Sequence, residues 1–296
     1  MSQLMSSISP NHSELEDLAQ WVGNTIVEHD HLDEFPLRGL SALLDYGTLP
    51  WSPTELPVLA HWLYFRPTSR ESELGMDGHP KRGKFLPPVP LDRRMWAGGD
   101  LKFLAPLPLG AEVEKKSTIS DIQIKKGSTG SLVFVKVRHE IKHKGHVCVD
   151  ENQDIVYRSL NTVVEKKKAT ERKKETPCAD IREEKVPTPT MLFRFSALTF
   201  NGHRIHYDQD YAIKKEGYEE RIVHGPLLST MLADLFYRMA PGQHVSRFSF
   251  RALKPLFVNQ SLQLCLRWTD KGAELWAENC RGEIAMNATI ESYGNG

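Results

Sequence analysis

The sequence lacks the features that mark several common classes of protein. None of its apolar runs approaches the roughly 18 residues of a membrane-spanning helix, and the first fifteen residues lack the basic and apolar regions of a signal peptide. Basic and acidic residues number 38 each, so the net charge is zero and neither nucleic acid nor a membrane surface is an expected partner. With 296 residues, 40% of them hydrophobic, the chain has room for about two domains.

Cysteine is equally scarce. Cys148, Cys178, Cys265 and Cys280 are scattered, and they form no CxxC motif and no close Cys/His cluster. A structural zinc site is therefore not expected, and we expect no other metal. Four scattered thiols suit a reducing compartment better than a disulfide framework does, which favours a cytoplasmic location.

The patterns that are present indicate a mixture of helices and strands. A first helix is predicted from Ser13, as its N-cap, to Ile26, and a second short helix begins near Pro36. The Gly- and Pro-rich segment 67–90 is predicted to be a long loop, and such loops are often functional. The predicted strands are 51–66, 112–124, 131–141, 146–157, 191–200, 262–268 and 284–290, with a further strand between the last two.

The clearest predicted element is a helix that follows Pro226. Apolar residues from Leu228 to Met239 recur at the i, i+3, i+4, i+7 spacing of a well-buried helix. Pro226 suits the first helical position, and Pro241 with the glycine after it ends the helix.

A short repeat indicates that the chain is internally duplicated. Leu104-Ala105-Pro106-Leu107 and Leu253-Lys254-Pro255-Leu256 are 149 residues apart, and both precede further strands at similar spacing. A duplicated unit of one long helix against an antiparallel sheet explains this pattern, although one weak repeat could arise by chance. The first unit is placed at 11–164 and the second at 187–296, with the charged stretch 165–186 as a solvated linker.

A polar motif breaks an apolar run near residue 200. The run 193–200 is apolar, and Asn201, His203, Arg204, His206, Tyr207 and Asp208 then follow within eight residues. So many polar side chains would need partners inside a core, so the segment is expected to be a loop that presents groups to a ligand. Two imidazoles supply acid–base capacity and Arg204 supplies a fixed positive charge. We treat His224-Gly225-Pro226 as part of the same site.

These motifs resemble a known family. The run 200–208, with His224-Gly225-Pro226-Leu227, resembles MaoC-like enoyl-CoA hydratases of the hot-dog fold. Phe85 to Pro90, followed by Arg93-Arg94-Met95-Trp96, is similar to the double hot-dog branch of mesaconyl-C4-CoA hydratase, itaconyl-CoA hydratase and type 2 hydroxyacyl-thioester dehydratase. The resemblance covers roughly residue 85 to the end. It implies an α+β double hot-dog, in which each of two units wraps an antiparallel sheet around a long central helix.

The resemblance also implies an activity. The expected enzyme is a hydro-lyase that adds water reversibly to an α,β-unsaturated acyl-CoA, with short dicarboxylic acyl groups such as itaconyl and mesaconyl-C4 leading. A 3-hydroxyacyl-thioester dehydratase of fatty-acid synthesis and a non-catalytic acyl-CoA-binding module stay open as alternatives. No cofactor is implied beyond the CoA of the substrate, and homodimerisation is left open.

Residue roles follow from the same resemblance. The family motif carries an Asp and, five residues later, a His; Asn201 and His206 stand at these positions. His206 is therefore predicted to carry the proton, while the neutral amide of Asn201 holds the water. The backbone N–H of Gly225, at a helix N-terminus, is predicted to bind the thioester oxygen. The expected substrate-binding residues are His203, Arg204, His224, Gly225, Arg93 and Arg94.

The arginines in this set have different expected ligands. Arg93, Arg94 and Arg204 are candidates for the phosphates of CoA, and Arg204 is alternatively the partner of a substrate carboxylate. The repeat offset places Ser52 and Pro57 opposite Asn201 and His206, so the first unit is not expected to be catalytic. One site is therefore expected per chain, at the seam between the units.

Overall fold

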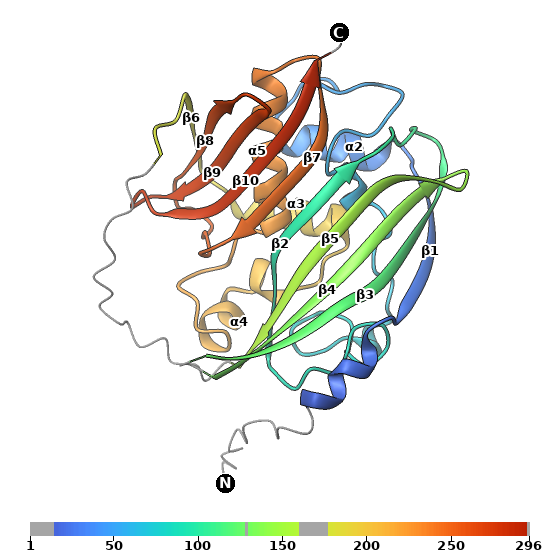
Figure 1. The fold of residues 1–296 in the computed structure, drawn as a ribbon. Coiled ribbons are helices and arrows are strands. Elements are labelled where there is room, and N and C mark those ends of the chain that lie inside the picture. Colours follow the sequence, from blue (N-terminus) through green and yellow to red (C-terminus); the bar gives the residue numbers. More distant parts are fainter. Residues whose placement is uncertain (1–14, 128–129, 160–176, 295–296) are drawn as a thin grey trace.

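One ten-stranded sheet runs through the computed structural model, which describes residues 15–127, 130–159 and 177–294 (Figure 1). The strands follow the order β1-β3-β4-β5-β2-β7-β10-β9-β8-β6, and all neighbouring strands are antiparallel. The first half of the chain (15–159) supplies β1 to β5, and the second half (177–294) places β6 to β10 in the mirrored positions. The two halves thus share one strand topology, as the repeat predicts.

The strands of the first half are β1 (Thr25–His31), β2 (Arg93–Phe103), β3 (Glu112–Gly127), β4 (Gly130–His143) and β5 (His146–Arg158). Those of the second half are β6 (Ile181–Lys185), β7 (Gln243–Ala252), β8 (Leu262–Thr269), β9 (Gly272–Asn279) and β10 (Ile284–Gly294). The α-helices are α2 (Phe35–Leu43), α3 (Pro189–Thr199), α4 (Gln209–Lys214) and α5 (Gly225–Met239). Single 3-10 turns form η1 (Asp17–Trp21), η2 (Ala60–Leu63), η3 (Glu71–Glu73) and η4 (Arg204–His206).

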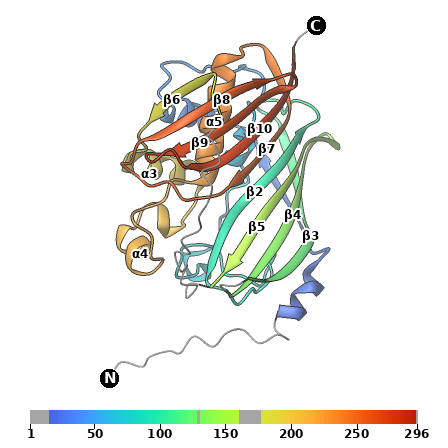
Figure 2. The same ribbon diagram turned by 60° about the vertical axis from the view of Figure 1, so that its left-hand side comes forward.

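The halves meet along β2 and β7, which lie side by side in the middle of the sheet (Figure 2). Asp100 and Ser249 are register partners at the centre of this pairing. The Arg247 guanidinium spans the seam and donates to both oxygens of Asp100, at 2.7 and 2.9 Å. A Cβ at Gly99 would lie 2.8 Å from the ring of Phe250, so the small residue lets this ring pack onto β2.

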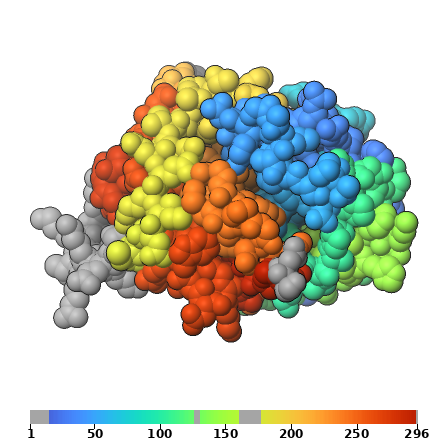
Figure 3. All heavy atoms as spheres, turned by 90° about the horizontal axis from the view of Figure 1, so that it is seen from above, coloured from blue at the N-terminus to red at the C-terminus, as the bar shows by residue number. Residues whose placement is uncertain are grey.

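Helix α5 confirms the strongest sequence pattern. Every residue from Leu227 to Phe236 is buried, so the helix is covered on all sides. One side contacts β7, β8 and β9. On the other side, Leu43 of α2 and Met191 of α3 line one cavity together with Met231 of α5. From above, the segment around α5 (orange) lies between yellow and blue segments of the chain (Figure 3).

The first half departs from the expected unit because it has no long helix. Just before α5, Ile222 forms a bridge with Phe257; the matching bridge of the first half joins Glu55 to Pro108. The segment after Glu55 therefore has the position in the first half that α5 has in the second half. Its only helical part is η2. Left-handed backbone at Leu59 (φ 68°) and Phe65 (φ 52°) interrupts any longer helix. The loop predicted at 67–90 follows, with η3 as its one turn of helix.

Two predicted strands are wrong. Residues 191–200 form most of α3, because the Thr188 side chain accepts a hydrogen bond from the backbone N–H of Met191 and Pro189 suits the first turn. Its buried positions, Leu192, Phe195, Ser196 and Leu198, follow helical and not alternating spacing. Residues 51–66 form turns and η2 instead of a strand.

The first predicted helix and the predicted linker also need correction. Ser13 lies outside the described residues, η1 ends at Trp21, and Gly23 (φ 90°) turns the chain into β1. The linker, placed at 165–186, lies outside the described residues up to 176, and its last part is β6, which pairs with β8. Charged residues suit this strand because it is an edge of the sheet.

Two further observations concern absences expected from the sequence. Within the described residues, no helix is long and apolar enough to cross a bilayer. The four cysteines are free thiols; Cys148 and Cys265 are buried, whereas Cys178 and Cys280 are exposed.

Candidate active site

The polar motif leaves α3 as a tight turn. Phe200 has a positive φ of 49° and ends the helix. The side-chain oxygen of Asn201 accepts a hydrogen bond from the backbone N–H of His203 at 3.0 Å. The turn η4 then buries Ile205 and His206. A loop that presents polar groups was predicted here, although it begins from a helix and not from a strand.

A chain of four imidazole rings passes through this loop. Ring centroids lie 4.1 Å apart between His79 and His203, 5.4 Å between His203 and His206, and 3.7 Å between His206 and His224. His79 belongs to the long loop of the first half, and the other rings belong to the second half. The cluster is therefore built from both halves of the chain.

The contact that brings His79 into place is a backbone contact between the halves. The Arg204 N–H donates to the carbonyl oxygen of Asp77 at 2.9 Å. Gly78 has a φ of +84°, and a Cβ there would lie 1.9 Å from the carbonyl oxygen of Gly202. Only glycine fits this position, so the loop sequence itself determines how closely His79 approaches the motif.

His206 is held in one tautomer. Its Nδ1 lies 2.7 Å from the carbonyl oxygen of Ile222, which can only accept, so Nδ1 donates and carries the proton. Nε2 has no hydrogen-bond partner among the described residues and keeps its lone pair. Burial lowers the pKa of His206 to about 4, so the ring is neutral at pH 7. A neutral imidazole with a free Nε2 can accept a proton.

His224 supports the His206 ring from the other side. Its Nε2 lies 2.9 Å from Ser196 Oγ of α3, and the two imidazoles are stacked. Burial, and then the neighbouring His206 and His203, hold the pKa of His224 well below its ordinary value. The side chain does not cap α5, which excludes that structural role.

The N-terminus of α5 begins beside this ring pair. Gly225 is the first helical residue, and its N–H has no hydrogen-bond partner among the described residues. The space that a Cβ would occupy at Gly225 is open. A free N–H at a helix N-terminus can bind a developing negative charge, which is the role predicted for Gly225.

Two of the predicted substrate-binding arginines are occupied by protein carboxylates. Arg204 binds Asp208 through Nε and Nη2, at 3.0 and 2.6 Å. Arg93 Nε lies 3.0 Å from Glu216 Oε2, and its side chain is largely buried. These ion pairs hold the motif and the loop after it in place. Because each guanidinium is already paired with a carboxylate, neither offers an uncompensated charge to a substrate anion.

Arg94 differs from both. It is half-buried and stands opposite Tyr157 in the β2–β5 register. Burial, and then the charges of Arg94 and of neighbouring histidines, place the pKa of His79 well below its ordinary value. The pKa of His203 is lowered in the same way. Arg94 thus acts electrostatically on both of these histidines.

Metal-ligand side chains also meet here. One ligand atom each from Asp77, His79 and His203 lies within 4.8 Å of the others. However, Asp77 Oδ1 already accepts the backbone N–H of His79 at 3.0 Å. The positive charges of Arg94 and Arg82 act on His79 as well. This field opposes a cation, so we assign no metal to the cluster.

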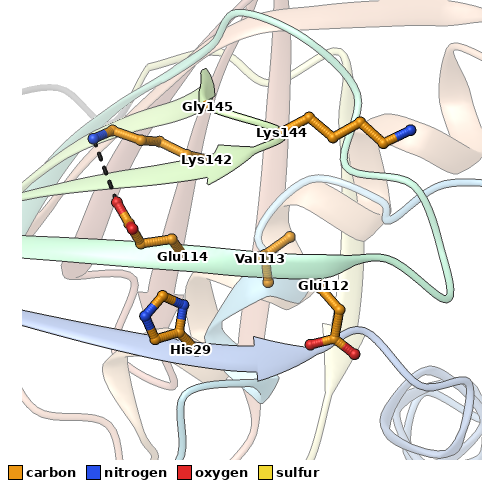
Figure 4. Close-up of a pocket in the computed structure, with 7 residues that line it drawn as sticks. All are labelled: His29, Glu112, Val113, Glu114, Lys142, Lys144 and Gly145. Carbon is orange, nitrogen blue, oxygen red and sulfur yellow. Dashed lines mark hydrogen bonds and ion pairs between the residues drawn. The ribbon is translucent and has the colours of Figure 1, made fainter.

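Two cavities lie away from the histidine cluster. One, of about 170 Å³, lies at the β1–β3 edge, where the lining side chains spread along the strands and do not converge (Figure 4). Lys142 and Glu114 pair there at 3.4 Å. The other, of about 340 Å³, lies between α2, α3 and α5. Neither is lined by a residue of the cluster.

The sequence indicated the motif but missed several of its neighbours. His79, Asp77, Ser196 and Tyr157 were not singled out. The expectation that the long loop is functional was the signal that could have led to His79. Ser196 could not be found that way, because its segment was read as a strand.

Comparison with known proteins identifies the same family that the sequence motifs resemble. The family model for hydroxyacyl-thioester dehydratase type 2 matches residues 59–258. Mesaconyl-C4-CoA hydratase of Chloroflexus aurantiacus is 39% identical over 280 residues, which cover 94% of this chain and 99% of that protein. The mitochondrial hydroxyacyl-thioester dehydratase type 2 of Schizosaccharomyces pombe is 32% identical over 285 residues, covering 86% of this chain and 92% of that protein.

Solved structures share the architecture. A MaoC-like dehydratase from Phytophthora capsici has a TM-score of 0.70 at 13% identity, covering 95% of this chain and 98% of that one. A Mycobacterium tuberculosis protein described as having a double hotdog fold has a TM-score of 0.56 at 11% identity, covering 96% and 99%. These likenesses concern the fold, and they confirm the predicted α+β double hot-dog.

Proposed function

We propose, from the premise that this chain belongs to the hydroxyacyl-thioester dehydratase type 2 family, that it is a hydro-lyase acting on acyl-CoA thioesters. It adds water reversibly to the α,β-double bond of a short dicarboxylic acyl group, mesaconyl-C4 or itaconyl. The observation that carries the proposal is His206, a neutral imidazole with Nδ1 fixed on a carbonyl oxygen and Nε2 free.

The chemistry follows from that tautomer. Nε2 of His206 takes a proton from water as the water oxygen attacks the β-carbon, and the electrons of the double bond move to the thioester oxygen. The N–H of Gly225, supported by the dipole of α5, stabilises the charge on that oxygen. His206 then returns its proton to the α-carbon, so hydration needs no other proton donor and no cofactor beyond CoA.

In Asn201, only one end of the side-chain amide is available to the water. Its Oδ1 is used by the backbone N–H of His203, so the Nδ2 group remains to donate to the water oxygen. Such a hydrogen bond positions the water but does not remove its proton. The division of labour therefore places proton transfer on His206.

A second function uses the same site. The S. pombe relative is named a hydroxyacyl-thioester dehydratase, and loss of water from a 3-hydroxyacyl thioester is the reverse of the same reaction. The length and charge of the acyl group separate the two functions. A cytoplasmic location is part of the proposal, and cell fractionation tests it.

The decisive experiment is a panel of enoyl-CoA esters followed by loss of absorbance of the conjugated thioester. We expect hydration of mesaconyl-C4-CoA and itaconyl-CoA. High activity on crotonyl-CoA without activity on carboxylate-bearing esters would favour the fatty-acid-synthesis dehydratase. Tight binding of CoA esters with no hydration of any of them would show a non-catalytic acyl-CoA-binding module.

A further inference from the structure

The arginines near the histidine cluster differ in what they bind. Arg93 and Arg204 are each neutralised by a protein carboxylate. Arg82 donates hydrogen bonds to three backbone carbonyls between residues 89 and 92. In the residues that the structure describes, the Arg94 side chain forms no ion pair, and the group to which it donates a hydrogen bond is the neutral hydroxyl of Tyr157. Among these four arginines, Arg94 is the one that has neither a paired carboxylate nor a set of carbonyl acceptors in the described part of the chain.

The groups around Arg94 also supply no negative charge to its guanidinium. Its cross-strand neighbour Tyr157 is fully buried, and the hydrogen bond between Arg94 and the Tyr157 hydroxyl is weak and involves a neutral acceptor. A partly enclosed guanidinium whose neighbour is a neutral hydroxyl has no compensating negative charge, and a bound anion would supply one. The imidazoles nearby, His79 and His203, are neutral or positively charged in their two protonation states, so neither can serve as the counterion.

We propose that Arg94 is the specificity-determining residue that binds a free carboxylate on the acyl group of the substrate. The inference rests on the proposed function, and it moves carboxylate recognition from Arg204 to Arg94. A planar guanidinium can bind a carboxylate through two parallel hydrogen bonds, which lysine cannot do. The first half, without catalytic histidines of its own, then determines which acyl group reaches His206.

A phosphate of CoA is the other anion that an arginine could bind. Arg94 directly follows Arg93 on β2, and Arg93 pairs with Glu216 in the loop after the motif. This end of β2 therefore lies beside the segment that carries His206, and the charge of Arg94 also contributes to the lowered pKa of His203. The phosphates are separated from the acyl group by the whole pantetheine arm. The acyl carboxylate is therefore the anion within reach.

The test uses two substrates that differ in one group. Mesaconyl-C4-CoA carries a carboxylate where 3-methylcrotonyl-CoA carries a methyl group. We expect Arg94→Gln to lower the ratio of their kcat/KM values about 10- to 100-fold, as loss of a charged hydrogen bond implies. Arg94→Lys, which keeps the charge and thus guards against a folding defect, should give an intermediate ratio. Arg138→Gln on β4 is the control, because its guanidinium pairs with Asp150 away from the cluster.

Binding separates failure of this inference from failure of the proposed function. Succinyl-CoA and butyryl-CoA form the same carboxylate–methyl pair without a double bond, so calorimetry measures them whether or not hydration occurs. A wild-type preference for succinyl-CoA that Arg94→Gln removes would support the role of Arg94, even in a protein that hydrates nothing. An unchanged preference would overturn it. An equal loss of affinity for both esters and for free CoA would also overturn it, and would place a phosphate on Arg94.

Discussion

The two halves of the sheet match strand for strand but differ in what lies against them. In the second half, α5 buries ten consecutive residues and its N-terminus faces the histidine cluster. In the first half, the single turn η2 occupies that place, and polar groups hold it: Glu151 of β5 accepts from His61 Nε2 at 3.0 Å and from Trp62 Nε1 at 3.1 Å. Both elements bury apolar residues, among them Leu59 and Leu63 in the first half, but η2 is in addition held by a buried carboxylate.

The difference shows how the duplicated unit divided its tasks. The second half has the long helix, and with it a helix N-terminus where charge can be stabilised. The first half has a long loop instead, which contacts the other half and supplies His79. Both halves have buried histidines. In the residues that the structure describes, His206 has Nδ1 fixed on a carbonyl oxygen and Nε2 without a partner, whereas the ring nitrogen of His224 that lacks a partner is Nδ1.

The largest expected effect is a loss of turnover in a variant of His206 that a variant of His61 does not show. His206→Ala should lower kcat by about 10²- to 10⁴-fold with a modest change in KM, because it removes the proton carrier of the transition state. His61→Ala is the matched control, since it removes a buried histidine from the first half and should lower stability instead of turnover per folded molecule. Near-normal kcat in His206→Ala would make His203 the next candidate.

The first half should depend on its buried carboxylate. Burial would raise the pKa of Glu151, but the His61 hydrogen bond and charge hold it below its ordinary value. Glu151→Gln leaves the same donors without an anionic acceptor and should cost about 3–5 kcal/mol of unfolding free energy. Urea denaturation measures this, and a loss below 1 kcal/mol, about that of a surface pair, would contradict it.

The histidine cluster should make stability depend on pH in a defined window. An unfolded histidine binds a proton below pH 6.5, whereas folded His206 stays neutral down to about pH 4. The contribution of His206 to the free energy of unfolding is therefore fully present above pH 6.5 and is lost as the pH drops towards 4. The loss from this group is on the order of 3 kcal/mol. His206→Gln should flatten that part of the curve in urea titrations, whereas Glu151→Gln should alter it chiefly below pH 4.5.

The contact between the halves can be weakened at one glycine. Gly78→Ala would place a methyl group against Gly202 and should cost about 1–3 kcal/mol, together with activity, because it moves His79. Gly145→Ala is the control: its φ of +81° is also left-handed, but no atom lies within 4 Å of the added Cβ. Equal losses in the two variants would show that only backbone strain matters.

The smallest effect sharpens the role of Asn201. Asn201→Asp restores the carboxylate of the wider family and places a negative charge near His206, which should raise the pKa of that ring. The acid limb of kcat/KM should then move up from about pH 4. Asn201→Ala should lower kcat less than His206→Ala does, since a second water can replace the amide. A dead Asn201→Ala enzyme beside an active His206→Ala enzyme would reverse the assigned roles.

Local patterns determined a large part of this structure. The 3.6-residue period after Pro226 is long enough to specify α5, and alternation specifies β3, β4, β5, β8 and β10. The segment 191–200 misled because its apolar residues fit either period. Two interactions favour the helix over a strand: the hydrogen bond of the Thr188 cap and the burial of Phe195 and Leu198. The burial depends on which other elements pack against the segment.

The sequence by itself also indicated the proposed catalytic motif, because Asn201 to His206 and His224 to Pro226 are short contiguous runs. Only the tertiary structure decided which positive charge stays available. Arg93 and Arg94 are adjacent, but successive side chains of a strand point to opposite faces. Arg93 therefore meets Glu216, 123 residues away, whereas Arg94 stands beside Tyr157 without a carboxylate. A partner so distant along the chain leaves no local trace in the sequence, so folding alone distinguishes a neutralised arginine from one that can bind substrate.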